Sequence, residues 1–261
     1  MILDDIVKNK RKEIEEKKRR ISLEELKSRV KDAPSPLDFK RAVTRNEYNP
    51  IKLIAEIKGK SPSMDPIEDL DPKGLAVNYE LSGASAISVV TDNKFFKGSL
   101  DILREVKQIT NIPVLSKDFI IDPYQIYESR CFQADSILLI ASILNAKELK
   151  NFLCLARDLG MSCVVEVHSD QDLDKALSAS PEIIGVNNRS LYTFLVDLNT
   201  TLRLKPQIPR DKTIIGMSGV KQREYVELLE EKGVDAVLVG EALLRSKDPG
   251  RKIKELLGKD V

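Results

Sequence analysis

Residues 52–58 read KLIAEIK, an apolar run that is too short for a typical helix. Its apolar residues do not alternate cleanly with polar ones, which is typical of a parallel strand buried on both faces. Runs of the same kind recur along the rest of the chain. They are AISVVT (86–91), IPVLSK (112–117), SILLIA (136–141), SCVVEV (162–167), EIIGVN (182–187), TIIGMS (213–218) and DAVLVG (235–240).

Helical patterns with start and stop signals separate these runs. Asp71-Pro72 places a capping residue before a proline suited to the first helical turn, and Gly83 can end that helix. Asp122-Pro123 has the same pattern of a capping residue followed by a proline. Eight strand–helix alternations predict an α/β protein with a (β/α)8 TIM barrel. An open doubly wound sheet is the alternative, but no GxGxxG follows the first strand.

Residues 1–48 do not fit this repeat. A stripe of apolar residues runs along a strongly charged first helix, and a second helix, SLEELKSRV (22–30), ends before two prolines. We expect an N-terminal helical extension that covers the barrel within one domain spanning 1–261. A separate partner-binding helix is the alternative. The stripe consists of Ile2, Leu3, Ile6, Val7 and Ile14.

Composition excludes several classes of protein. Among 261 residues, 42 Lys and Arg stand against 41 Asp and Glu, so no global field attracts nucleic acid or an anionic membrane. The three cysteines lack metal-type spacing, and we interpret them as reduced thiols. No apolar segment is long enough for a signal peptide or a membrane span. A cytoplasmic, monomeric protein is expected.

Charged and polar residues gather at the ends of the predicted strands. Glu56 and Lys58 lie two residues apart and therefore point to the same side, and Lys117, Glu166 and Asn187 close other strands. Four charges inside a barrel are costly unless they compensate one another or have a function. Active sites of such barrels lie at these strand ends, so the group predicts a catalytic site. The alternative is an ion pair without a role.

These residue types suit proton transfer or covalent chemistry. Lys58 and Lys117 are candidates for a general acid, an anion clamp or a Schiff base, and Glu166 is a candidate acid or base. We interpret His168, the only histidine, as a loop residue beyond the strand end.

Glycines after the last two strands predict a phosphate site. MSGV (217–220) and VGEALL (239–244) follow the seventh and eighth runs, where these barrels bind phosphate. The backbone amides of Gly219, Gly240 and Glu241 can approach the anion, with Lys58 and Ser61 completing the clamp. A sugar phosphate substrate follows from this arrangement.

Phenylalanines follow the second and third runs. Phe95, Phe96 and Phe119 either pack under a loop or form an apolar wall for an aromatic ring.

Taken together, these motifs resemble indole-3-glycerol phosphate synthases. The resemblance covers essentially the whole chain and includes ILDDIVKNKRKEI, IAEIKGKSPS, SVVTDNKFFKGS, PVLSKDFIID, ADSILLIASIL, VVEVH, IIGVNNRSL and VLVGEAL. It implies conversion of 1-(2-carboxyphenylamino)-1-deoxyribulose 5-phosphate into indole-3-glycerol phosphate, carbon dioxide and water in tryptophan biosynthesis. No metal or organic cofactor, nucleic acid or membrane is implied.

The resemblance also implies roles. Lys117 is the general acid of ring closure, and Glu166 assists proton removal and loss of hydroxide. Glu56 and Lys58 shape the electrostatic field of the site. Asn187 orients the substrate. Further residues match loop support and phosphate or substrate contacts (Arg189, Ser61, Ser218, Gly219, Gly240, Glu241) and the pocket around the anthranilate ring (Phe96, Phe119, Leu138, Leu191).

Three positions depart from the family pattern. Met217 stands where a glutamate usually precedes Ser-Gly, and Ser190 replaces the usual Asp or Asn. Ser63 is followed by Met64-Asp65-Pro66, where the loop usually contains glycine. Two rival functions stay open at this point. One is a Schiff-base aldolase using Lys58 or Lys117, and the other is a barrel that binds phosphosugars without catalysis.

Overall fold

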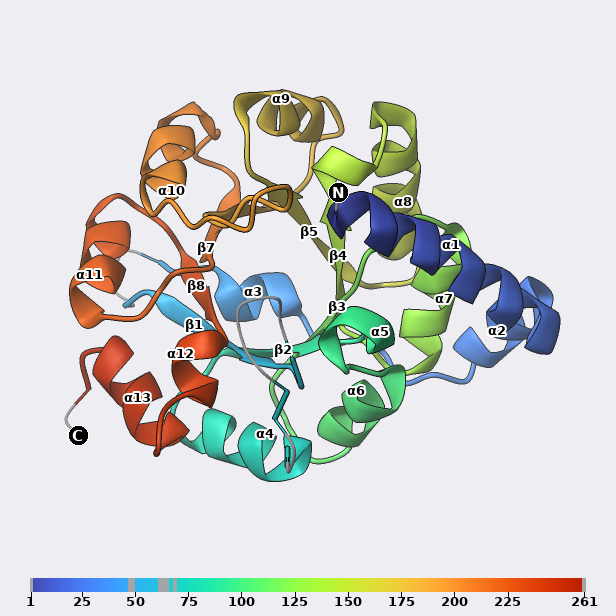
Figure 1. Cartoon of the computed structure of the whole chain (residues 1–261), viewed down its shortest axis with the longest axis horizontal. Helices are drawn as coiled ribbons and strands as arrows, with labels where there is room; N and C mark the ends of the chain where they lie inside the picture. Colours follow the sequence, from blue (N-terminus) through green and yellow to red (C-terminus); the bar gives the residue numbers. More distant parts are fainter. Residues whose placement is uncertain (1, 47–49, 61–65, 68–69, 260–261) are drawn as a thin grey trace.

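The chain folds into a closed parallel barrel, β1-β2-β3-β4-β5-β6-β7-β8, in which β8 pairs with β1 (Figure 1). The computed structural model describes residues 2–46, 50–60, 66–67 and 70–259. Closure confirms the TIM barrel and rules out the open sheet. The strands are β1 Lys52–Ile57, β2 Ala86–Val90, β3 Val114–Lys117, β4 Ser136–Ile140, β5 Ser162–Val167, β6 Ile183–Asn187, β7 Thr213–Met217 and β8 Ala236–Val239.

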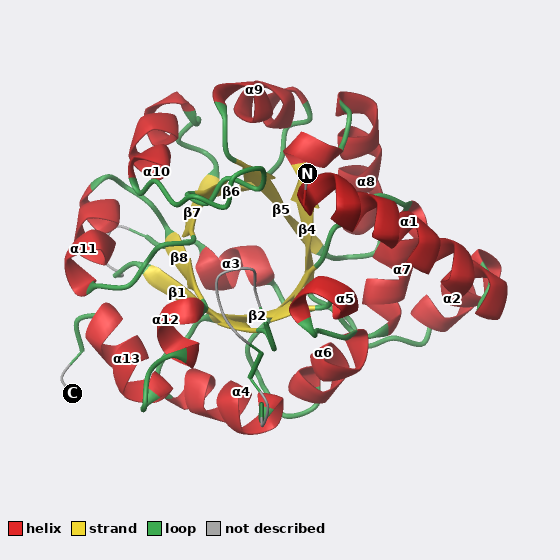
Figure 2. Ribbon diagram, viewed as in Figure 1, coloured by secondary structure: helices red, strands yellow, loops and turns green. Residues whose placement is uncertain are grey.

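Helices surround this barrel as an outer ring (Figure 2). The predicted caps form: the Asp71 side chain accepts from Gly74 N, and Asp122 accepts from Tyr124 N. After β1 the helices are α4 Pro72–Leu81, α5 Asn93–Phe96, α6 Leu100–Lys107, α7 Pro123–Cys131, α8 Ala146–Asp158, α9 Asp170–Ser178, α10 Asn199–Leu204, α11 Arg223–Glu231, α12 Glu241–Leu244 and α13 Pro249–Leu256, with 3-10 turns η1 Ala141–Ile143 and η2 Lys205–Gln207.

Side chains inside the barrel form layers contributed by alternate strands. The register and the alternation of strand residues place one apolar layer at mid-height: Ile54, Leu115, Val164 and Ile215. Two residues further along the same strands, three of the four inward-facing side chains are charged. That upper layer consists of Glu56, Lys117, Glu166 and Met217.

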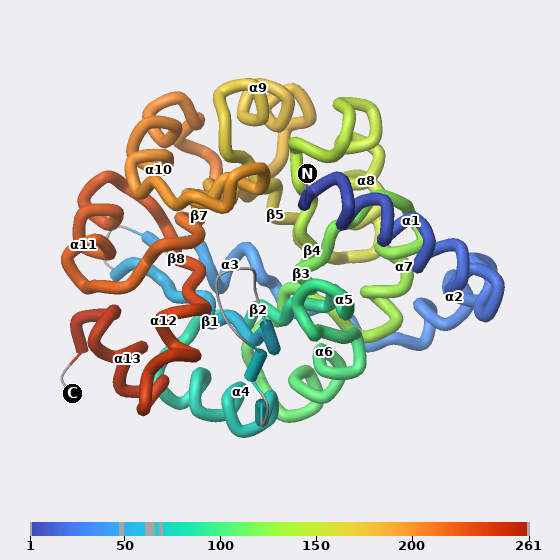
Figure 3. The backbone as a smooth tube through the Cα atoms, viewed as in Figure 1, coloured from blue at the N-terminus to red at the C-terminus, as the bar shows by residue number. Residues whose placement is uncertain are grey.

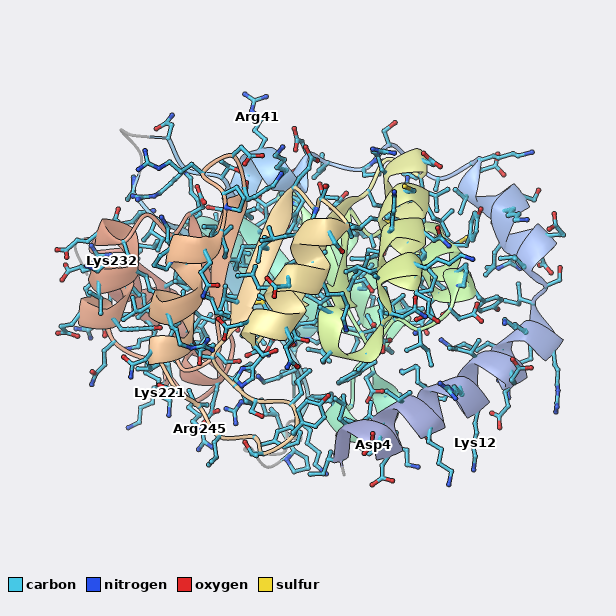
Figure 4. The ribbon with its side chains drawn as sticks, turned by 90° about the horizontal axis from the view of Figure 1, so that it is seen from above. Asp4, Lys12, Arg41, Lys221, Lys232 and Arg245 are labelled. Atoms are coloured by element: carbon cyan, nitrogen blue, oxygen red, sulfur yellow. The ribbon has the colours of Figure 1, made fainter. Side chains whose placement is uncertain are left out.

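Three helices precede the barrel, one at each end and one beside the outer ring of helices. In α1 (Ile2–Arg20), Leu3, Ile6 and Ile14 are buried, which confirms most of the predicted stripe, although Ile2 is exposed. The helix runs along the end from which Lys221 and Arg245 extend (Figure 4). The second helix, α2 (Leu23–Val30), packs beside α7.

The third helix, α3 (Phe39–Val43), was not predicted. Phe39 and Val43 are fully buried in the interior cluster that includes Ile54 and Ala86, and Arg41 extends from the opposite end to Lys221 (Figure 4). This short helix therefore closes the amino-terminal end of the barrel.

Figure 3 traces the chain from α1 to α13 and places the two termini apart on the ring of helices. No helix in the described part of the chain is both long enough and apolar enough to cross a membrane.

Candidate active site

A cavity of about 380 Å³ opens at the carboxyl ends of the strands. It brings together residues from all eight strands or the turns that follow them. Ser61 and the loop departures at 63–65 lie outside the described residues. All other predicted site residues line the cavity: Glu56, Lys58, Phe96, Lys117, Phe119, Leu138, Glu166, Asn187, Arg189, Leu191, Ser218, Gly219, Gly240 and Glu241.

Glu56 joins the two lysines on one side of the cavity floor. Its Oε1 lies 2.6 Å from Lys58 Nζ, and its Oε2 lies 3.7 Å from Lys117 Nζ. Burial alone would raise the pKa of Glu56, which is 4% exposed, but the two lysines outweigh burial and lower it. Glu56 therefore stays ionised and holds both ammonium groups at the floor. The ion pair foreseen as the alternative exists, but it faces the cavity.

Glu166 lies on the other side of the cavity floor, where its hydrogen-bond partner is the uncharged amide of Asn187. Asn187 Nδ2 donates to Glu166 Oε1 at 2.9 Å, while Arg189 N donates to Asn187 Oδ1 at 2.9 Å. The second bond fixes the orientation of the amide, because its oxygen is occupied by a donor. Burial raises the pKa of Glu166, against the lowering influence of Lys117 and Asn187. This carboxyl group is therefore suited to exchange a proton.

Neighbouring polar residues hold the strand ends. His168 Nδ1 donates to Asn187 O at 2.7 Å from outside the floor, which supports its interpretation as a loop residue. Asn188 is fully buried, and its amide links Ser218 O, Tyr225 Oη and Thr201 Oγ1. These bonds tie the turns after β6 and β7 together.

The aromatic wall lies at the β2–β3 edge. The rings of Phe96 and Phe119 stand 6.0 Å apart at 32°. Leu138 and Leu191 also line the cavity. Phe95 packs against the same interior cluster without lining the cavity. The wall therefore offers apolar surface to a flat ring.

The opposite edge is built from tight backbone turns. Ser218 and Gly219 both have positive φ, at 66° and 78°, and a Cβ on Gly219 would lie 2.6 Å from Leu198 and Val196. A Cβ on Gly240 would lie 2.5 Å from Glu56 Oε1. A Cβ atom at either glycine would collide with these neighbours. The two positions at which the backbone borders the cavity therefore require glycine.

Arg189 links the turn after β6 to the first residue of α12. Its Nη1 donates to Phe194 O at 3.0 Å, and its Nη2 lies 3.5 Å from Glu241 Oε2. Ser190 Oγ accepts from Tyr192 N and Thr193 N, both at 3.3 Å. A hydroxyl at position 190 thus caps the turn.

Met217 faces the barrel interior but does not line the cavity. It is 1% exposed and packs with Leu238 and Ile215 in the interior cluster. A Cβ on Gly185 would lie 2.9 Å from Met217 Cε, so the thioether fills the space above that glycine.

Sequence reasoning missed several lining residues, including Asp118, Phe194, Val196 and Leu198. Asp118 directly follows Lys117, and this adjacency was the available signal. The other three lie in the segment after β6, where the sequence carries no periodic pattern. Within the described ranges, no group of three or more His, Cys, Asp or Glu side chains is arranged to hold a metal ion.

Solved structures share the architecture at low sequence identity. A 3-hexulose-6-phosphate synthase matches with a TM-score of 0.62 and 15% identity over 80% of this chain and 99% of its own. A mutant tryptophan synthase alpha-subunit from Pyrococcus furiosus matches with a TM-score of 0.58 and 18% identity, over 79% and 98%. These likenesses concern the fold alone.

Sequence relatives are far more similar. A family model described as "Indole-3-glycerol phosphate synthase" matches residues 3–256. Relatives of that description share 46% identity in Acetivibrio thermocellus, over 98% of both chains, and 45% in Dehalococcoides mccartyi (strain CBDB1), over 98% of this chain and all of the relative. The chain therefore belongs to the indole-3-glycerol phosphate synthase family and is a carboxy-lyase of tryptophan biosynthesis.

Proposed function

We propose that the cavity closes the indole ring of 1-(2-carboxyphenylamino)-1-deoxy-D-ribulose 5-phosphate and releases carbon dioxide and water. The observation that carries this proposal is the pairing at the cavity floor. Glu56 holds Lys58 and Lys117 on one side, and Asn187 holds Glu166 on the other. A proton donor and a proton-exchanging carboxyl group thus face the same space.

The two edges of the cavity suit the two ends of this substrate. The carboxyphenyl ring packs against Phe96 and Phe119, and the phosphate binds near Gly219 and Gly240. The ketose carbons then cross the floor between Lys117 and Glu166. Holding the reacting carbons together in this way lowers the entropic part of the barrier.

Ring closure joins the carboxylate-bearing ring carbon to the ketose carbonyl carbon. Lys117 donates a proton to the carbonyl oxygen as that bond forms, so the oxygen becomes a hydroxyl group. The bond to the carboxylate then breaks, its electron pair restores the aromatic ring, and carbon dioxide leaves. No electron-accepting cofactor is needed in this step, because the dearomatised ring accepts the electron pair.

Dehydration completes the indole. A proton leaves the carbon next to the ring nitrogen, the hydroxyl group departs as water after protonation, and the double bond forms between the two carbons. Glu166 removes the proton and assists the departure. Its raised pKa suits this work, because a carboxyl group that titrates closer to neutrality both gives and takes protons.

Fluorescence of the product tests the proposal directly. The chain contains no tryptophan, so indole emission that grows on incubation with the substrate reports product alone. The expected result is indole emission matched by one equivalent of carbon dioxide. Substrate consumption without indole, or a borohydride-trapped lysine adduct, would instead favour the aldolase, and binding without turnover would favour the non-catalytic barrel.

A further inference from the structure

A buried lysine outside the cavity floor connects α1 to the turns behind the aromatic wall. Lys10 is 5% exposed, and its Nζ lies 2.9 Å from Asp92 Oδ2, 2.9 Å from Asp118 Oδ1 and 2.9 Å from Glu13 Oε2. Lys10 has no place in the ring-closure chemistry. Burying charged groups costs free energy, so a lysine buried among carboxylates is expected to have a structural or functional role.

Asp92 organises the turn after β2. Its Oδ1 accepts from Phe95 N at 2.8 Å, which caps α5, and its carbonyl accepts from Gly98 N at 2.8 Å. Since α5 ends at Phe96, the orientation of Asp92 helps to decide where that ring lies.

Asp118 organises the turn after β3 in the same way. Its Oδ1 accepts from Phe119 N at 2.7 Å, and its Oδ2 accepts from Thr91 Oγ1 at 2.9 Å. The carboxylate therefore links the backbone of Phe119 to the end of β2. Lys10 bridges Asp92 and Asp118, and through them the two rings of the wall.

Apolar contacts support the same connection. Leu3 and Ile6 of α1 belong to the interior cluster that contains Phe119, and Val7 and Phe96 pack against that cluster. Burial alone would lower the pKa of Lys10, but Asp118 and Asp92 raise it, so the ammonium group stays charged. The helix thus presents a fixed charge and an apolar face to the back of the wall.

We propose that Lys10 is a positioning residue that aligns Phe96 and Phe119 for the substrate ring. The proposal rests on the proposed function, since it assigns that ring to this wall. Lys117 itself is held by the strand ladder, because Thr91 N donates to Lys117 O at 3.0 Å. Loss of Lys10 therefore disturbs substrate binding more than the proton transfer.

Steady-state kinetics of Lys10→Met, which keeps an unbranched side chain one atom shorter and removes the charge, test this. KM should rise about tenfold, since small misplacements of binding groups are costly, while kcat stays within about threefold. Lys10→Arg should restore most of the KM. Lys18→Met is the matched control, because Lys18 also ties α1 to the barrel, 2.7 Å from Asp122 Oδ2, but away from the wall. Its KM should equal that of the wild type.

Equal KM values for Lys10→Met and Lys18→Met, with equal losses of thermal stability, would overturn the positioning role and leave Lys10 as an attachment point. If Lys10→Met does not fold, Asp118→Asn breaks the same bridge from the other side. Its KM should rise likewise, and an unchanged KM would overturn the proposal. Wild-type turnover is measured first, so failure of the proposed function is seen separately.

Discussion

The β1–β3 side and the β5–β6 side of the cavity floor each bury a carboxylate in the same layer of the barrel. Glu56 is 4% exposed and Glu166 is 3% exposed, yet their pKa values move in opposite directions. Burial raises both, but Glu56 has two lysine partners and Glu166 is bonded to a neutral amide. The partner, rather than the depth of burial, decides which carboxylate has the lowered pKa and which has the raised one.

The largest effect is expected from Lys117→Ala. Removing a general acid lowers kcat by roughly 100- to 10,000-fold, while the wall and the glycine turns still bind substrate. Single-turnover kinetics and a binding titration together separate these two effects. A fall in kcat of less than about fivefold would move the acid role to another residue.

Glu166→Gln sharpens the comparison from the other side. The glutamine can still accept from Asn187 but cannot exchange a proton, so kcat should fall by about 100-fold. Since ring closure precedes the step that needs Glu166, a ring-closed intermediate should accumulate. Quenched reactions analysed by mass spectrometry would detect it, and a buildup of unreacted substrate alone would contradict the assignment.

Stability as a function of pH should distinguish the two carboxylates. The raised folded-state pKa of Glu166 means that its contribution to stability is present below its unfolded pKa and is lost as pH rises through the folded value. Glu166→Gln should therefore gain stability relative to the wild type as pH rises through this window. The lowered pKa of Glu56 contributes stability above its unfolded pKa, which is lost as pH falls, so Glu56→Gln should be less stable near neutrality.

Urea unfolding at several pH values measures both trends. Each unit of pKa shift corresponds to about 1.4 kcal/mol. Parallel curves for the two variants would show that the environments of the two carboxylates are alike.

The smallest catalytic effect is expected at Met217, the fourth member of the layer. Met217→Glu places a third carboxylate beside Glu56 and Glu166, and we expect a few-fold higher kcat with a displaced pH profile. Met217→Gln is the control, because it adds a polar group of similar size without charge. The pH dependence of kcat is measured from about pH 6 to 9. An unchanged dependence in Met217→Glu would show that a charge at this position does not influence the catalytic groups.

Much of the site could be predicted because it depends on local sequence. Parallel strands all point their carboxyl ends to one end of a barrel, so residues such as Lys117 and Glu166 converge wherever the strands are identified. The caps at Asp71 and Asp122 are equally local, since each side chain bonds a backbone amide within three residues. These features need no knowledge of distant contacts.

The strand runs, the helix caps and the polar strand ends are thus determined by the sequence itself. Three other features depend on the tertiary structure: the closure by Phe39 and Val43, the bridge from Lys10 to Asp92 and Asp118, and the opposite pKa shifts of the two carboxylates. The closure and the bridge join residues far apart in the chain, and the pKa shifts depend in part on Lys117 and Asn187, which approach the two carboxylates only in the folded barrel. Burial and charge pairing act through space, so the partners become visible only when the barrel brings them together.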